Sequence, residues 1–239
     1  MQNILLPALL MLSLTIGAAP DPSQITQTLH IGILDFPPNY SCKDDTITGT
    51  YVLLLKQVST RAGFKHTLKC YPPKRLYTVL ASGEVDFYMG LKTTEEYKNR
   101  VLYSKEAMRH IELRLYAASH KTLPITKEQW PGNRFVIQNG YNYGGLITHL
   151  ETLEQQGEII LHRSAEHSNA VKMLHSGRAD YFLGYKNAVE TVTKEMGAPT
   201  LDSQEIYKLN LHFLVSKKTP AAAEVLQRLE AAYQSMEAQ

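Results

Sequence analysis

Two stretches of the chain repeat the same order of polar and apolar positions. LASGEVDFYMG spans residues 80–90, and LHSGRADYFLG spans residues 174–184. In each, an apolar helical pattern stops at Ser-Gly, and glycine suits the left-handed residue that follows a helix. The short aromatic and apolar run that comes next indicates a buried strand. Each stretch therefore predicts a helix leading into a strand, which is half of an α/β unit.

A match this short is compatible with coincidence, but the order of elements before it repeats as well. The first copy predicts strands and helices at 29–34, 50–64, 65–70, 75–83 and 85–89, and the second at 134–138, 146–157, 158–163, 169–177 and 179–183. Apolar residues recur at helical spacing, for example at Leu146, Leu150 and Leu153. The loops differ in length, so the repeat is one of architecture. The pattern predicts an α/β protein of two βαβαβ lobes, each a small, mainly parallel sheet flanked by helices.

The N-terminus carries a short apolar run, ILLPALLMLSLTIGAA, followed by the polar and helix-breaking PDPSQ. Such a run predicts a cleaved secretory signal peptide over residues 1–19, with cleavage near Ala18 or Ala19. The alternatives are a buried helix or a membrane anchor, and the start MQN lacks the usual Lys or Arg. No cysteine is present in this region, so a lipoprotein is not expected.

Net charge and hydropathy limit the classes of partner that the sequence predicts. The chain has 239 residues, of which 44% are hydrophobic, and a formal net charge of +2. This near-neutral balance gives no electrostatic reason to expect nucleic acid or an anionic membrane as a partner. No segment beyond the N-terminus is long and apolar enough to span a membrane. We expect a monomer with no direct membrane insertion.

The only two cysteines are Cys42 and Cys70. An even count in an exported chain allows one disulfide. Cys42 follows the first predicted strand and Cys70 ends the second, so neighbouring parallel strands would place both at one edge of the sheet. We expect a disulfide between them, and two separate thiols are the alternative.

Ligands of open parallel sheets bind beyond the carboxyl ends of the strands, which selects a set of loops here. NGYNYGG offers backbone N–H groups before a helix, although it also fits a glycine-rich turn with surface tyrosines. Arg75 stands at a helix start, where a cation is unfavourable, so it hints at another partner, or it is simply solvated. Thr94 begins a predicted helix as a possible N-cap. The candidate ligand-binding residues from these loops are Phe36, Tyr40, Arg75, Lys92, Asn139, Tyr141, Asn142, Tyr143 and Tyr185.

The sequence motifs give little support for catalysis or for metal binding. GxSxG and HExxH motifs are absent, and His162 and His167 lie five apart around a loop, which is poor metal-ligand spacing. We expect no enzyme activity, no metal and no cofactor.

Three segments together resemble the bacterial extracellular solute-binding proteins of family 3. They are LHIGILDFPPNYS with ITGTYVLLLKQV, LASGEVDFYMGLKTTEEYKNRVLYS, and RFVIQNGYNYGG with GRADYFLGY. The resemblance covers roughly residues 27–236. It implies a two-lobed periplasmic-binding-protein fold of type II, with 108–119 and 205–216 as crossing segments that form the hinge. Residues 25–112 plus 209–239 would form lobe 1, and residues 113–208 would form lobe 2.

The resemblance also implies a function. Family members are mostly periplasmic receptors that close over a small molecule and present it to an ABC importer in the inner membrane. We therefore expect a periplasmic solute-binding protein with a small-molecule ligand and an ABC permease as partners. The alternatives are a sensor module for a signalling partner and, with less support, a small dehydratase on the same fold.

Two positions depart from the amino-acid-binding pattern of the family. Tyr97 stands where family members have the arginine that holds the ligand carboxylate, and Tyr185 stands where they often have the acid that holds the ammonium. The sequence thus predicts a small polar or aromatic ligand that is not a standard amino acid held by an Arg/Asp clamp. Stacking and neutral hydrogen bonds would hold it, with Lys92 and Arg75 supplying positive charge.

Overall fold

A computed structural model describes residues 27–43, 46–123 and 125–238. The predicted signal peptide, residues 1–19, lies outside the described residues.

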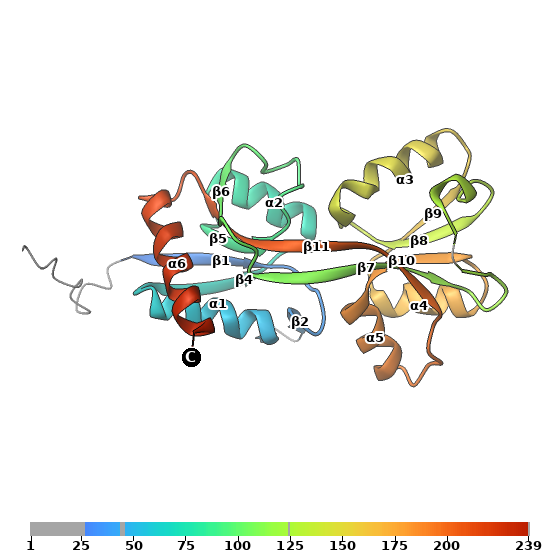
Figure 1. The fold of residues 1–239 in the computed structure, drawn as a ribbon, viewed down its shortest axis with the longest axis horizontal. Coiled ribbons are helices and arrows are strands. Elements are labelled where there is room, and N and C mark those ends of the chain that lie inside the picture. Colours follow the sequence, from blue (N-terminus) through green and yellow to red (C-terminus); the bar gives the residue numbers. More distant parts are fainter. Residues whose placement is uncertain (1–26, 44–45, 124, 239) are drawn as a thin grey trace, which may run out of the picture.

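The chain folds into two α/β lobes that are joined by two long strands (Figure 1). Lobe 1 has a parallel core in the order β4-β1-β5, and lobe 2 has a parallel core in the order β9-β8-β10. In both lobes the first strand in the sequence is central, with helices on both faces of the sheet. The two-lobed α/β fold predicted from the repeat is confirmed. The lobe 1 elements are β1 (Thr28–Ile33), α1 (Thr50–Arg61), β4 (Lys65–Cys70), α2 (Pro73–Ser82) and β5 (Phe87–Gly90), and the lobe 2 elements are β8 (Arg134–Gln138), α3 (Leu146–Gln155), β9 (Ile160–Ser164), α4 (His167–His175), β10 (Tyr181–Tyr185) and α5 (Lys186–Glu195).

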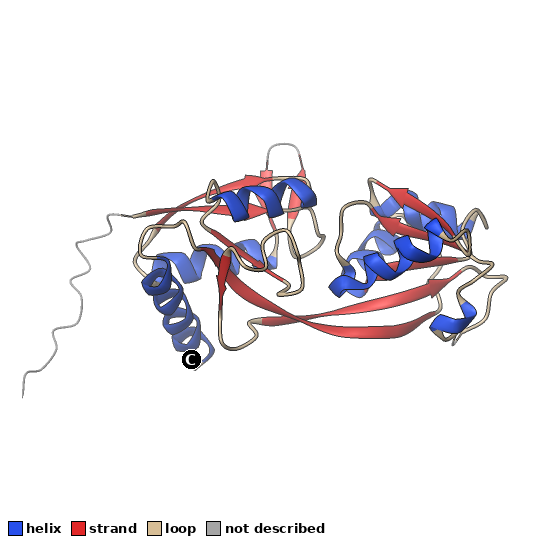
Figure 2. Ribbon diagram, turned by 90° about the horizontal axis from the view of Figure 1, so that it is seen from above, coloured by secondary structure: helices blue, strands red, loops and turns tan. Residues whose placement is uncertain are grey.

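The two connecting strands are β7 (Arg109–Ala117) and β11 (Ser203–Ser216), which pair antiparallel along most of their length. The last part of β11 pairs with β5 of lobe 1, and the last part of β7 pairs with β10 of lobe 2. Figure 2 shows the two strands running from one lobe to the other beneath the space between them. The lobe boundaries predicted at residues 112 and 208 fall inside these strands, where Glu112 and Lys208 are register partners. We keep them as the proposed boundaries.

Smaller elements complete the lobes. Strand β6 (Val101–Tyr103) pairs with β11, and α6 (Ala222–Glu237) packs on α1 and β11, so the C-terminal helix joins lobe 1. A hairpin of β2 (Ser41–Lys43) and β3 (Thr46–Thr48) occupies the loop after β1. Short 3₁₀ turns, η1 (Lys127–Gln129) and η2 (Tyr143–Gly145), lie in lobe 2. Within the described ranges, no helix combines the length and apolar character needed to cross a membrane.

The repeated motif has the same structural role in both lobes. Gly83 and Gly177 follow α2 and α4 with φ angles of 83° and 66°, as the left-handed position after a helix requires. The aspartates that come next each accept a backbone N–H from the central strand, His30 N–H to Asp86 and Arg134 N–H to Asp180, both at 2.8 Å. The shared Asp therefore fastens the third strand of each lobe to the first.

One predicted element is not formed. Residues 95–100 make a run of turns where the sequence predicts a helix beginning at Thr94. The side chain of Tyr97 is fully buried, and its hydroxyl donates to the Leu91 carbonyl at 2.5 Å. Because this ring is buried, the segment lies against the lobe. The polar residues around Tyr97 would not bury an apolar face if they formed a helix.

Candidate functional site

An inner cavity of about 50 Å³ lies between the lobes, and seven of its fifteen lining residues are aromatic. Lobe 1 and lobe 2 both contribute rings, and Ile111 and Leu211 of the connecting strands close the cavity on the hinge side. Both lobes thus contribute to its wall. The aromatic lining residues are Phe36, Tyr40, Tyr77, Tyr88, Tyr97, Tyr141 and Tyr185.

The rings of the two lobes touch each other directly. Phe36 of lobe 1 packs edge-on against Tyr185 of lobe 2, with ring centroids 5.2 Å apart, and against Tyr141 at 6.1 Å. Behind this contact, Tyr143 stacks on Tyr185 at 5.6 Å with an interplanar angle of 12°. Such aromatic pairs stabilise a contact beyond their buried area. The lobes therefore meet through a specific aromatic junction.

Hydrogen bonds also cross between the lobes. The hydroxyl of Tyr141 donates to the backbone carbonyl of Asp35, and the hydroxyl of Thr93 donates to Asn142 Oδ1 at 3.3 Å. Asn142 Oδ1 also accepts the Gly145 N–H at 2.8 Å, which holds its side chain in place. These bonds and the aromatic junction define a closed arrangement of the two lobes.

Burial raises the pKa of every tyrosine that lines the inner cavity. Desolvation is the main cause at Tyr40, Tyr88, Tyr97, Tyr141 and Tyr185, and neighbouring tyrosines add to it. The pKa of Tyr77 is raised for the same reason. All of these hydroxyls stay neutral near pH 7, so they can donate and accept hydrogen bonds and carry no charge.

An outer cavity of about 380 Å³ adjoins the inner one and shares Tyr141 as a wall. Both lobes line it, through Asp35, Tyr71, Gln138 and Asn139 among others. Asp35 is exposed, and its Oδ1 accepts the Cys42 N–H at 3.0 Å. The two cavities together form the candidate site.

The structure brings six of the predicted site residues to the inner cavity: Phe36, Tyr40, Tyr97, Tyr141, Asn142 and Tyr185. Asn139 is exposed and lines the outer cavity, and Tyr143 lies behind Tyr185. Both tyrosines at the clamp positions, 97 and 185, therefore face the space between the lobes.

The two predicted cations lie outside both cavities. Arg75 forms an ion pair with Glu84 at 3.2 Å, which accounts for a cation at this helix start. The Lys92 ammonium lies 5.8 Å from the centre of the Tyr103 ring. In this arrangement neither side chain lines the inner or the outer cavity.

Sequence reasoning missed Asp35, Tyr77, Tyr88 and Gln138. Tyr77 and Tyr88 lie within α2 and β5, where an aromatic residue is expected in the core. Asp35 and Gln138 each sit at the carboxyl end of a strand, and the rule that selected the loops could have found them.

Cys42 and Cys70 are joined in a disulfide, with their Cα atoms 6.2 Å apart. Both line the outer cavity, so the bridge borders the candidate site. Among the described residues there is no group of three or more His, Cys, Asp or Glu side chains that could hold a metal ion.

Two lobes, two connecting strands and a cavity between them define the class of two-lobed ligand-binding proteins that close around a small molecule. The family model of bacterial extracellular solute-binding proteins, family 3, matches residues 29–239. The chain belongs to this family. Comparison with curated protein sequences gives no match.

Solved structures share the fold over most of the chain. An ancestral arginine-binding protein bound to arginine has a TM-score of 0.73 at 19% identity, covering 90% of this chain and 94% of that one. A histidine kinase sensor domain with similarity to periplasmic binding proteins has a TM-score of 0.73 at 16% identity, covering 90% and 92%. A putative L-cystine ABC transporter from Listeria monocytogenes has a TM-score of 0.68 at 19% identity, covering 88% and 90%. At these identities the likeness establishes the fold.

Proposed function

We propose that this protein is a periplasmic receptor that captures a small molecule between its lobes by hinge closure and presents it to an ABC importer. The observation that carries the proposal is the cavity lined by aromatic rings from both lobes, with Tyr141 bonded across to Asp35. A ligand that touches both lobes stabilises the closed form, because it binds that form better than the open one. The closed form is then the state that a membrane partner recognises.

We further propose that the ligand is not a standard amino acid held by an Arg/Asp clamp. No Arg or Asp side chain of the described residues lines the inner cavity, and the clamp positions hold the neutral Tyr97 and Tyr185. A carboxylate buried there would lose its water without gaining a cation. The ligand is recognised by ring contacts and hydrogen bonds.

Binding rather than catalysis fits the chemistry of the inner cavity. Its titratable groups are tyrosines whose pKa values are raised by burial, which moves them away from the range useful for proton transfer at neutral pH. A dehydratase would need a general acid or base whose pKa lies near the working pH.

The first test is thermal unfolding of the mature protein against about a hundred small metabolites, including all standard amino acids. A ligand at about 1,000 times its Kd stabilises a protein by about 4 kcal/mol. For a chain of this size the midpoint should rise by about 8–16 °C. A large shift with a compound other than a standard amino acid supports the proposal. A shift with ordinary amino acids alone contradicts the proposed ligand class, and no shift with any compound contradicts the receptor function.

A transport assay distinguishes an ABC importer from a signalling partner. The ligand found in the screen is offered to membrane vesicles that contain the candidate permease, with and without this protein. Uptake that depends on the protein supports the importer. Lack of uptake, together with ligand-dependent activation of a sensor kinase, favours the signalling alternative.

A further inference from the structure

The two cavities that flank Tyr141 contain one charged lining residue between them, and it is an acid. The inner cavity is lined by no Asp, Glu, Lys or Arg of the described residues, and the outer cavity is lined by Asp35 alone among charged side chains. A third cavity, of about 230 Å³, also borders Tyr141 and is lined by charges of both signs. In this cavity, Arg163 donates two hydrogen bonds to Glu154, at 2.9 and 2.6 Å. Lys74 is the other cation that lines it. The site therefore favours positive charge on the ligand.

Asp35 is an exposed acid with no counter-ion among the described residues. Its carboxylate accepts the Cys42 N–H, and within the described part of the chain no Lys, Arg or His forms an ion pair with it. His167 lies close enough to sense its charge, but burial lowers the pKa of His167 to about 4. The imidazole is thus neutral at pH 7 and leaves the negative charge of Asp35 uncompensated.

Gln138 lines the same cavity as Asp35 and carries a second acceptor. Its side chain is 7% exposed, and its Nε2 donates to the Ala165 carbonyl, which fixes the orientation of the amide. Its Oε1 is buried and has no hydrogen-bond partner. A buried carbonyl without a donor is costly, so a ligand donor that reaches this oxygen would remove that cost.

The tyrosines of the inner cavity also present acceptors. The hydroxyls of Tyr40 and Tyr97 donate to the carbonyls of Met89 and Leu91 at 3.3 and 2.5 Å, and Tyr141 donates to Asp35. With their hydrogens committed, these oxygens offer lone pairs, and the rings offer negative π faces. The inner cavity is small as well, at about a third of the volume of an engineered cavity of about 150 Å³ that binds benzene. It suits a short alkyl group next to a cation.

We propose that the ligand is a small alkylammonium compound without a carboxylate. Its ammonium group lies in the outer cavity against Asp35 and Gln138, and its alkyl part enters the inner cavity among the tyrosines. This inference rests on the proposed receptor function, because the same closure between the lobes must enclose the ligand.

The test uses three compounds that share a four-carbon chain and differ in charge: n-butylammonium chloride, butan-1-ol and sodium butyrate. Isothermal titration calorimetry at constant ionic strength should show n-butylammonium binding at least about tenfold more tightly than butan-1-ol, because it gains the charge of Asp35. Butyrate should give no binding. Equal binding of the amine and the alcohol, tighter binding of butyrate, or no binding of the amine overturns the inference. In each case the metabolite screen still decides the receptor function separately.

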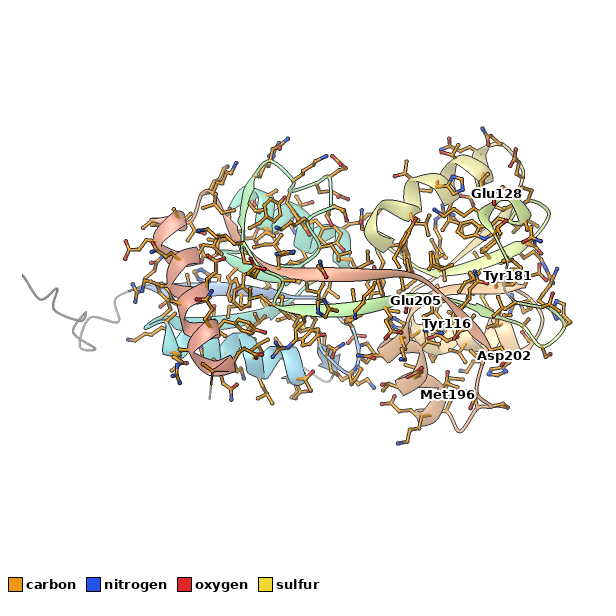
Figure 3. The ribbon with its side chains drawn as sticks, viewed as in Figure 1. Tyr116, Glu128, Tyr181, Met196, Asp202 and Glu205 are labelled. Atoms are coloured by element: carbon orange, nitrogen blue, oxygen red, sulfur yellow. A yellow bond between two sulfur atoms is a disulfide. The ribbon has the colours of Figure 1, made fainter. Side chains whose placement is uncertain are left out.

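The variant Asp35→Asn and a matched control test whether the preference for a positively charged ligand arises from Asp35. The variant keeps an oxygen that can accept the Cys42 N–H, and it should weaken n-butylammonium binding by about tenfold while leaving butan-1-ol unchanged. The control is Asp202→Asn in lobe 2, which removes an exposed carboxylate on the side of that lobe away from lobe 1 (Figure 3). It should change neither affinity. Equal effects of the two substitutions on the amine would mean that general electrostatics, and not Asp35, selects the ligand.

Discussion

His167 shows how burial at the site couples to pH. It begins α4, is 5% exposed, and packs against Tyr141 with ring centroids 5.8 Å apart. Burial lowers its pKa in the folded protein from 6.5 to about 4, although the Asp35 charge opposes the shift. Between these values the unfolded chain binds more protons than the folded one. The stability that neutral His167 provides is complete above pH 6.5 and is lost as the pH falls toward 4.

We predict that the free energy of unfolding falls by about 2 kcal/mol between pH 8 and pH 5 because of this one residue. His167→Phe keeps a ring against Tyr141 but cannot take up a proton. Urea unfolding of both proteins across this range should show that the variant loses less stability by that amount. If the free energies of unfolding of the two proteins change with pH in parallel, protonation of His167 does not cause the loss of stability.

Single residues were the hardest part of the site to predict from sequence. Tyr97 and Tyr185 were found because a family resemblance drew attention to their positions, and both line the inner cavity. Arg75 pairs with Glu84, nine residues ahead, and nothing in the sequence pattern links the two. Gln138 could be placed at a strand end, but an unpartnered Oε1 is a property of the packed structure.

At the scale of elements, the sequence predicted the helices and strands whose positions are set by the periodicity of apolar residues. Helices and strands of the repeat were placed to within a few residues, because each has a buried apolar face that the pattern records. The helix expected at Thr94 failed because one buried tyrosine, Tyr97, outweighs local helical propensity. The hairpin of β2 and β3 was missed because its strands are short and contain no buried residue.

The hairpin leads to the prediction at this scale. The disulfide connects β2 to the end of β4 and closes a segment with a sequence separation of 28. In the chain-entropy model such a cross-link stabilises the fold by about 3–4 kcal/mol. The double substitution Cys42→Ser and Cys70→Ser should lower the free energy of unfolding by that amount, measured by urea denaturation under oxidising conditions.

Reduction provides the control for this prediction. A thiol reductant should lower the stability of the wild-type protein to near that of the double variant and leave the variant unchanged. A double variant that unfolds at the same urea concentration as the oxidised wild type would show that the bridge adds no stability.

At the scale of the whole molecule, the two lobes are connected by β7 and β11 and meet again across the cleft. The connecting strands set the hinge, and the contacts opposite them decide how often the cleft is closed. Tyr141 is central among these contacts, because its hydroxyl bonds to Asp35 and its ring touches Phe36. One side chain thus contributes to closure and borders both cavities of the site.

Tyr141→Phe removes the hydroxyl but keeps the ring. A hydrogen bond of this kind contributes about 0.5–1.5 kcal/mol, so its loss should shift the ratio of closed to open molecules by about fivefold toward the open form. Small-angle X-ray scattering of the unliganded protein should then give a larger radius of gyration than that of the wild type. Tyr143→Phe is the matched control, because the Tyr143 hydroxyl bonds to the Gln138 backbone within lobe 2 and not across the cleft. Removing that hydroxyl weakens lobe 2 without releasing lobe 1. If both variants expand equally, the opening follows from weakened packing in lobe 2, and the bond from Tyr141 to Asp35 does not hold the lobes together.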